Sequence, residues 1–290
     1  MQNFIEVNGA AFYTQEGGPH NLSKVTARND GIIFEGEGAQ AQVRILREKA
    51  MEALFVACRL EEKGVATLRE RESVCFTLDL ARTLPFVSVY QHKEWWLRPA
   101  FGDVLREIPA ASQLIIFEDS REYHCLLAVS GKENRADLAG GEEGILLTLS
   151  ANISGQKEME DLALVYGHGQ DPYALTEEMA GFALRLTGKR LTLRREKKFP
   201  EIFEKLGWCT WDSLGVHVNE EAIITKMREF QEKKLPVPWV LIDDGWSLID
   251  ANKRTLKSLD ADLEKFPQGI AGTVRKLKED YGVEYVGVWQ

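Results

Sequence analysis

The chain contains few of the residues that build disulfide frameworks and metal sites. Its 290 residues include four cysteines, and none of them has the close paired spacing of a zinc site or a redox motif. The five histidines form no H-x-H or H-E-x-x-H pattern. We therefore expect reduced thiols in apolar surroundings, as in most cytosolic proteins, and no dedicated metal. The cysteines are Cys58, Cys75, Cys125 and Cys209.

Long apolar runs and an excess of positive charge are also missing. No stretch approaches the roughly 18 consecutive apolar residues of a membrane span, and the N-terminus lacks the basic and apolar regions of a signal peptide. Lys and Arg number 36 against 45 Asp and Glu, giving a net charge of -9. A nucleic-acid-binding face needs clustered Lys and Arg. We expect a cytoplasmic protein without nucleic-acid or membrane partners, whose ligand is neutral or weakly charged.

The remaining composition is that of a folded chain. Hydrophobic residues make up 44% of the sequence and charged residues 28%. At this length the chain buries a substantial core, and we expect two domains.

The first 170 residues alternate between apolar and polar side chains, the period of half-buried strands. Ser73 to Leu80 and Gly144 to Ala151 show this most clearly, and turn signals such as Gly-Gly and Asn-Asp-Gly separate the segments. Further strands are predicted at Gly31–Glu35, Ala41–Leu46, Leu54–Leu60, Phe86–Trp96, Gln113–Glu118 and Tyr123–Val129. Many short strands of this kind predict an antiparallel β-sandwich over residues 1–170.

A helix is predicted between the two domains. Asp171 and Pro172 are typical of a helix cap and first position, an apolar stripe follows, and Gly188 is typical of a helix end. We interpret residues 171–203 as a helical linker.

The last part of the chain alternates strands and helices. Three apolar segments, Leu206–Trp211, Val237–Trp246 and Glu284–Trp289, predict strands, with helices expected after the cap Asn219 and before Gly282. The order β-α-β-α-β predicts the first units of a (β/α)8 TIM barrel over residues 204–290. A whole barrel takes about 250 residues, so an incomplete barrel with its first three strands is expected.

Carboxylates and a tryptophan stand at the ends of these strands, where ligands collect in parallel α/β folds. Asp243 and Asp244 end the second strand, and Trp211 and Asp212 end the first. A sugar ring is held by an aromatic surface against its C–H face and by carboxylates that accept hydroxyl hydrogen bonds. The alternative is that Asp243 and Asp244 cap the backbone of the next helix.

Ordered motifs carry a resemblance to a known family. They are GWCTWDSLG (Gly207–Gly215), LIDDGW (Leu241–Trp246), EKFPQG (Glu264–Gly269), the final YGVEYVGVWQ, and the double-tryptophan segment EWWLRPAFGDVLREIPAASQLIIFE (Glu94–Glu118). Together they resemble the raffinose synthase and seed imbibition protein branch of glycoside hydrolase family 36. Two departures, at Leu97–Pro99 and at Gln290, leave acceptor preference open.

The resemblance implies an α-galactosidase-like or galactosyl-transferring enzyme, acting on raffinose-type α-galactosides by retaining double displacement and needing no cofactor. It implies that Trp211 lines a galactose subsite and that Asp243 and Asp244 bind sugar hydroxyls. Adjacent carboxylates approach a ligand from one side, whereas a catalytic pair flanks the scissile bond. The family's nucleophile and acid/base are expected beyond Gln290, so the chain alone is expected to be inactive.

Three further tryptophans have two interpretations each. Trp96, with Trp95, belongs either to the core of the N-terminal domain or to the substrate site, and we include Trp96 among the substrate-binding candidates. Trp246 either packs in the core or forms a wall of the site. We include both Trp246 and Asp212 among the substrate-binding candidates. Trp208 is assigned to the core.

Two other functions remain open. One is a carbohydrate-binding fragment without turnover, and the other is a metal-dependent barrel enzyme in which Asp243 and Asp244 hold a cation such as Mg²⁺. Because the last predicted strand would expose Val286, Val288 and Trp289 at an edge, we also expect a homo-oligomer or a complementary C-terminal chain.

Overall fold

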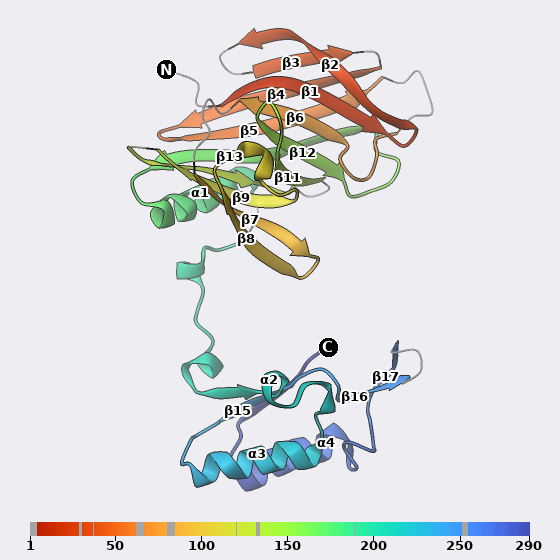
Figure 1. Cartoon of the computed structure of the whole chain (residues 1–290), viewed down its shortest axis with the longest axis vertical. Coiled ribbons are helices and arrows are strands. Elements are labelled where there is room, and N and C mark those ends of the chain that lie inside the picture. Colours follow the sequence, from red (N-terminus) through yellow and green to blue (C-terminus); the bar gives the residue numbers. More distant parts are fainter. Residues whose placement is uncertain are drawn as a thin grey trace. The chain divides into compact units, whose positions relative to one another are not determined.

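The computed structural model divides into two compact units, Met1–Arg194 and Arg195–Gln290 (Figure 1). Each unit is described by itself. The structure describes residues 5–28, 31–36, 38–61, 67–79, 85–119, 121–131, 134–188, 190–250 and 255–290.

The first unit is built on one antiparallel sheet. Its order in the described residues is β10-β13-β5-β4-β3-β2-β1-β6-β12-β11-β9-β7-β8. The strands are β1 (Glu6–Thr14), β2 (Gly17–Arg28), β3 (Gly31–Gly36), β4 (Ala39–Glu48), β5 (Met51–Leu60), β6 (Val74–Asp79), β7 (Phe86–Lys93), β8 (Trp96–Gly102), β9 (Ser112–Glu118), β10 (Tyr123–Ala128), β11 (Asn134–Gly140), β12 (Ile145–Ala151) and β13 (Glu158–Gly169).

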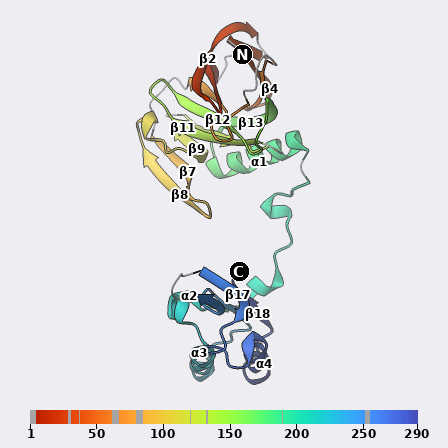
Figure 2. The ribbon, with the colours of Figure 1, turned by 90° about the vertical axis from the view of Figure 1, so that its right-hand side faces the viewer.

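The sheet closes on itself because β10 pairs with β13 on one side and with β9 on the other. Eleven strands thus form a closed circuit, to which the β7–β8 hairpin is attached through β9 (Figure 2). Alternate side chains of the strands point inward, and the buried ones form the core. The largest buried side chains include Phe34, Phe76, Leu78, Ile115 and Leu138.

This closure contradicts the predicted fold class. A β-sandwich has two sheets packed face to face, whereas this unit is a single closed antiparallel sheet. Alternation in the sequence reports which face of a strand is buried, and that is the same in a sandwich and in a closed barrel. Leu80, part of one predicted strand, lies outside the described residues.

Helix α1 (Pro172–Thr187) packs on the first unit. Asp171 caps it by accepting hydrogen bonds from the amides of Tyr173 and Ala174, and Gly188 ends it at a φ of 62°. Leu175, Met179 and Phe182 of α1 are buried together with residues of β5, β10 and β13. The helix therefore contributes to the core of the first unit.

The second unit contains a small parallel sheet in the order β14-β15-β18, and helices α3 and α4 lie side by side on one face of it (Figures 1 and 2). A separate antiparallel hairpin, β16–β17, follows β15. The elements are β14 (Gly207–Cys209), α2 (Trp211–Leu214), α3 (Glu220–Glu232), β15 (Trp239–Ile242), β16 (Ser247–Asp250), β17 (Thr255–Ala261), α4 (Gly269–Tyr281) and β18 (Tyr285–Val288).

The two units together contain the short 3-10 turns η1 (Leu105–Glu107), η2 (Arg194–Glu196), η3 (Glu201–Glu204) and η4 (Gly215–His217).

The predicted start of a TIM barrel is likewise wrong. The described residues are mostly strands with only four α-helices, and the parallel strands form an open three-stranded sheet. A hairpin, β16–β17, also stands between β15 and α4. Strands of three or four residues are too short to reveal from sequence how the sheet continues.

No helix in the described part of the chain is long and apolar enough to cross a membrane.

Candidate functional site

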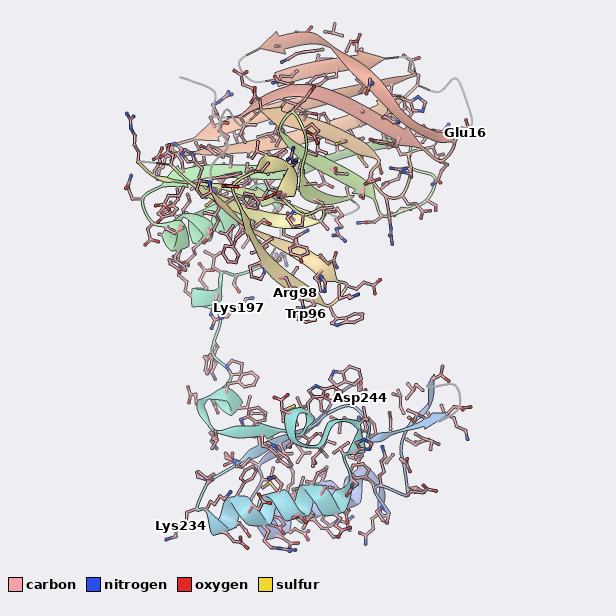
Figure 3. The ribbon with its side chains drawn as sticks, viewed as in Figure 1. Glu16, Trp96, Arg98, Lys197, Lys234 and Asp244 are labelled. Carbon is pink, nitrogen blue, oxygen red and sulfur yellow. The ribbon has the colours of Figure 1, made fainter. Side chains whose placement is uncertain are left out.

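The three parallel strands of the second unit end at one edge of their sheet. Cys209 pairs with Leu241, and Ile242 pairs with Val288. The amide of Thr210 continues the pairing by donating to the carbonyl of Leu241 at 3.0 Å. The residues that follow β14, β15 and β18 therefore lie along the same edge, where Figure 3 labels Asp244.

Asp243 is held by the last residue of β14 and by the residue that follows it. The Cys209 thiol donates to Asp243 Oδ2 at 3.1 Å, and the Asp243 amide donates to Thr210 Oγ1 at 2.9 Å. The amide of Asp244 donates to Asp243 Oδ1 at 2.7 Å. Both carboxylate oxygens thus have a donor, and a half-buried carboxylate keeps further lone pairs for a ligand.

The electrostatics of this pair favour a protonated thiol. Burial raises the pKa of Cys209, the Trp211 amide that donates to its sulfur lowers that pKa, and the Asp243 carboxylate raises it. Because the net pKa is raised, Cys209 remains a neutral hydrogen-bond donor to Asp243 at neutral pH.

The turn after Asp244 is held by a glycine and a lysine. Gly245 has a φ of 103°, and a Cβ there would lie 2.5 Å from the carbonyl oxygen of Val216. Lys265 Nζ donates to the carbonyls of Gly245 at 2.7 Å and Val216 at 2.9 Å. The Gly245 amide in turn donates to Asp244 Oδ1 at 2.7 Å. The two aspartates therefore accept amide hydrogen bonds from their own turn rather than from a following helix.

The tryptophans near this edge differ in exposure. Trp211, the first residue of α2, is 46% exposed, and Asp212 beside it is exposed as well. Trp246 is only 6% exposed, and its indole Nε1 donates to the carbonyl of Trp289 at 2.8 Å. Trp208 packs edge-on against Phe230 at a centroid distance of 5.5 Å. Trp211 and Trp289, which is 51% exposed, are therefore the rings in this group that offer a free face to a ligand.

Trp96 belongs to the first unit, where it begins β8. Its ring is 48% exposed and carries the Arg98 guanidinium at 4.0 Å from the centroid, and the His92 ring meets it edge-on at 5.5 Å. Trp95, in the turn before it, is 82% exposed. Neither ring packs in the core, and the assignment of Trp96 to the substrate site stays a prediction.

The sequence interpretation missed the residues that support Asp243. Cys209 was assigned only as a buried thiol, whereas it donates to the candidate carboxylate, and Thr210, Gly245 and Lys265 were not singled out. A parallel pairing of GWCT with LIDD could have indicated these contacts, because it places the residues at the ends of the two strands next to each other. Among the described residues, no group of three or more His, Cys, Asp or Glu side chains is arranged to hold a metal ion.

Comparison with known families identifies the chain. A family model described as raffinose synthase or seed imbibition protein Sip1 matches residues 39–284, which is most of the sequence. The chain belongs to this family.

The curated relatives include plant galactosyltransferases. The chain is 31% identical over 188 residues to a probable galactinol–sucrose galactosyltransferase 4 of Arabidopsis thaliana, a match that covers 63% of this chain and 21% of the relative. It is 26% identical over 325 residues to the galactinol–sucrose galactosyltransferase of Pisum sativum, covering 99% and 39%. The chain thus spans about a fifth to two fifths of the length of these relatives.

Solved structures show a likeness of fold. The chain resembles an α-galactosidase of glycoside hydrolase family 36 from Geobacillus stearothermophilus, solved in complex with raffinose, at a TM-score of 0.50 and 14% identity. The match covers 98% of this chain and 43% of that one. A second structure from the same organism, in complex with stachyose, gives the same TM-score and identity.

Proposed function

We propose that this chain supplies the galactosyl-binding part of an enzyme that transfers or hydrolyses α-galactosyl groups of raffinose-type sugars. The observation that carries the proposal is the Asp243 carboxylate, which accepts from the Cys209 thiol at the same sheet edge after which the exposed Trp211 follows. A carboxylate accepts two hydroxyl hydrogen bonds while a tryptophan covers the apolar face of a pyranose. The family membership and the printed names of the relatives support the same substrate class.

In this proposal, Asp243, Asp244 and Trp211 bind substrate and do not perform the bond cleavage. A retaining mechanism needs two carboxyl groups about 5 Å apart on opposite sides of the scissile bond. Asp243 and Asp244 are consecutive and are linked to each other through the Asp244 amide, so they approach a sugar from one side. We assign the nucleophile and the acid/base to residues outside these 290, in a longer form of the enzyme.

The first test is hydrolysis of a nitrophenyl α-galactoside by this chain and by the chain extended along its natural reading frame. We expect activity only in the extended form. Activity of the 290-residue chain would show that the catalytic carboxylates have been assigned wrongly.

The second test locates the binding role within the extended form. Asp243→Asn removes a charged acceptor, for which a loss of about 1.5–3 kcal/mol, or roughly 10- to 160-fold in kcat/KM, is expected. Asp280→Asn, on the exposed surface of α4, is the matched control and should leave kcat/KM unchanged. Equal effects of the two substitutions would contradict a sugar-binding role for Asp243.

A carbohydrate-binding function without turnover is the second candidate, because the oriented carboxylate and the exposed ring both lie within this chain. It requires that galactose binds to the 290-residue chain, in a titration followed by tryptophan fluorescence, and that the extended form also fails to hydrolyse the galactoside. Hydrolysis by the extended form rejects it.

We also propose that the outer edge of β18 is covered in solution by a second copy of the chain or by a complementary chain. Within the described residues β18 pairs only with β15, and Tyr285 and Trp289 are exposed next to that edge. An unpaired strand edge with exposed aromatic side chains favours association. Light scattering should detect a species larger than one chain, and a monodisperse monomer would contradict the proposal.

A further inference from the structure

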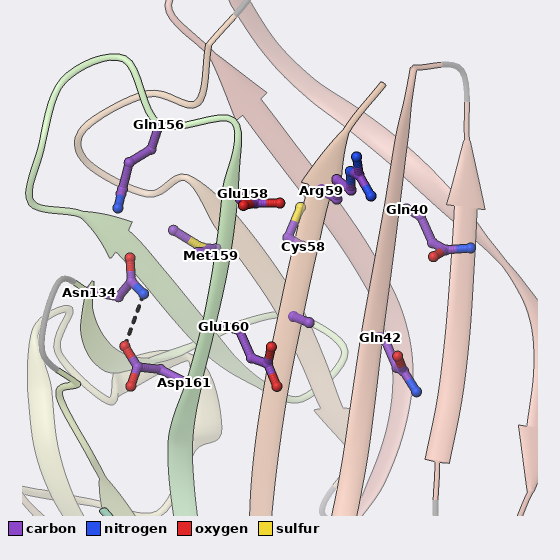
Figure 4. A pocket seen from close by; sticks show the side chains of 11 residues that line it. Gln40, Gln42, Cys58, Arg59, Asn134, Gln156, Glu158, Met159, Glu160 and Asp161 are labelled. Atoms are coloured by element: carbon purple, nitrogen blue, oxygen red, sulfur yellow. Dashed lines mark hydrogen bonds between the residues drawn. The ribbon is translucent and has the colours of Figure 1, made fainter. Parts of the chain in front are cut away.

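Polar side chains gather at two places outside the residues assigned to galactosyl binding. Figure 4 shows the first, on the closed sheet of the first unit. Arg59 and Glu160 are exposed there on the outer face of β5 and β13, whereas Asn134 and Met159 are buried on the inner face. Successive residues of a strand point to opposite faces, so these side chains do not surround one ligand. The second place is Lys265 of the second unit, next to the turn that carries the aspartates.

Lys265 lies in the connection from β17 to α4, and its ammonium group joins two other connections. Nζ donates to the carbonyl of Gly245 at 2.7 Å and to that of Val216 at 2.9 Å. Gly245 follows Asp244 directly, and Val216 lies in η4, in the same connection as Trp211. One side chain therefore links the segment that carries the exposed ring to the segment that carries the carboxylates.

Each of these two segments is held internally by a short-range hydrogen bond. The Gly215 amide donates to the Trp211 carbonyl, so the ring and Val216 belong to one compact turn. In the other segment, the Gly245 amide donates to Asp244 Oδ1 at 2.7 Å. A displacement of either carbonyl that Lys265 binds is therefore passed on to a side chain assigned to the sugar.

The contact between the two segments favours a cation. The Gly245 turn packs closely on Val216, since a Cβ at Gly245 would lie 2.6 Å from the Val216 Cα. Both carbonyl oxygens lie within hydrogen-bond distance of one Nζ, so their partial negative charges are brought near each other. Hydrogen bonds from an ionised donor are about twice as strong as neutral ones, and the ammonium group offsets this repulsion.

The backbone of Lys265 is itself anchored. Phe266 beside it is fully buried in the core of the second unit. The Lys265 carbonyl accepts from the Glu220 amide at 3.0 Å, and the Asp262 amide donates to the Trp246 carbonyl at 3.0 Å. The ammonium group thus reaches the two carbonyls from a fixed position and can hold them in place.

We propose that Lys265 is a positioning residue of the galactosyl site, which sets the separation of the Trp211 ring and the Asp244 carboxylate without touching the sugar. The inference rests on the proposed function, since it requires that these two side chains bind the same sugar. Without the ammonium group the two segments move apart and sugar binding weakens. The residues that break the bond, which we assign outside these 290, are not affected.

The first measurement is amide hydrogen exchange in the 290-residue chain, which requires no activity. Lys265→Met keeps the length of the side chain and removes its charge and its donors. Exchange in the native state reports local opening, so the amides of Asp244 and Gly245 should exchange about tenfold faster or more. Lys278→Met, on the exposed surface of α4, is the matched control and should leave both amides unchanged. Unchanged exchange in a folded Lys265→Met variant overturns the proposal.

The second measurement is a double-mutant cycle on the hydrolysis of a nitrophenyl α-galactoside by the extended form. Lys265→Met should raise KM by about tenfold and leave kcat nearly unchanged, because it removes binding that the ground state and the transition state share. The same substitution should raise KM much less in an Asp244→Asn background, since residues that act together are not additive. Lys265→Arg keeps a charged donor and should restore most of the lost affinity.

The outcomes distinguish this inference from the proposed function. A purely structural role of Lys265 predicts a lower apparent kcat from lost folded protein with KM unchanged, and this result overturns the positioning role. An equal rise of KM in the parent and in the Asp244→Asn background also overturns it and leaves the proposed function standing. An unchanged KM in Asp244→Asn itself contradicts the proposed function and this inference together. If Lys265→Met does not fold, Lys265→Gln, which can still donate to one carbonyl, replaces it in both measurements.

Discussion

At the scale of single residues, the turn that presents Asp244 depends on the glycine that follows it. Gly245→Ala would introduce a Cβ at 2.5 Å from the Val216 carbonyl oxygen and force alanine into a φ of 103°. Strained backbone of this kind costs of order 1–3 kcal/mol before the clash is counted. We expect a loss of unfolding free energy of at least that size in urea denaturation, and weaker galactoside binding.

Gly269→Ala is the matched control, because Gly269 also has a positive φ, of 65°, but no atom lies within 4 Å of the added Cβ. It should cost clearly less than Gly245→Ala. Equal costs for the two variants would show that the contact with Val216 relaxes freely and that Gly245 is needed for its backbone conformation alone.

The candidate site was predictable from sequence only in part. The positions of Asp243, Asp244 and Trp211 after strands follow from apolar runs that end at polar residues. The hydrogen bond from Cys209 to Asp243 does not, because it depends on the register of β14 against β15. Burial of Trp246 likewise depends on packing in the core of the second unit, which a local pattern does not contain.

At the scale of elements, helices α3 and α4 are joined by Glu220. Its carboxylate accepts from Lys276 Nζ and from Thr273 Oγ1, both on α4. The hydrogen bond from Lys276 is the largest effect on the pKa of Glu220 and holds it below its ordinary value of 4.5. Burial raises this pKa by less than Lys276 lowers it, and the hydrogen bond from Thr273 lowers it further. The contact thus favours the ionised carboxylate in the folded state.

The sign of the pH dependence follows from that lowered pKa. The stabilisation is present above the unfolded-state pKa of Glu220, near 4.5, and is lost as the pH falls through the lower folded-state value. Glu220→Gln should therefore lower the thermal unfolding midpoint at pH 7, and the difference from the parent should vanish as the pH falls below about 4.5. Glu279→Gln, an exposed substitution on α4, should show no such convergence. A difference that shows no decrease as the pH falls below about 4.5 would indicate lost packing rather than lost charge.

The boundaries of the helices were accessible from sequence because they are set by local chemistry. Asn219 accepts from the Ala222 amide at the start of α3, and Gly282 ends α4 at a φ of 67°, as the caps predict. The predicted strand Phe86–Trp96 is instead divided into β7 and β8 by a turn. The hairpin β16–β17 was not predicted, since its side chains are largely exposed and give no clear alternation.

At the scale of the whole molecule, the closure of the first sheet could not be derived from its strands. Closure depends on β10 pairing with both β9 and β13, and these partners stand at opposite ends of an eleven-strand circuit. Each strand's own alternation is satisfied equally well by two packed sheets. The long-range pairing, and not any local preference, determines the architecture.

Closure has a consequence for the independence of the first unit. Residues 1–194 contain their own buried core, and in the described residues their strands form one closed circuit. We expect this fragment to fold alone, with cooperative thermal unfolding and a native near-ultraviolet circular dichroism spectrum.

A shorter fragment that ends at residue 170 lacks α1 and exposes Ala53, Cys125 and Val165, which α1 covers. Because Leu175, Met179 and Phe182 each contribute about 1.5–3 kcal/mol on burial, the shorter fragment should be less stable by roughly 5 kcal/mol or more. Equal stability of the two fragments would show that α1 only lies on the closed sheet and contributes nothing to its core.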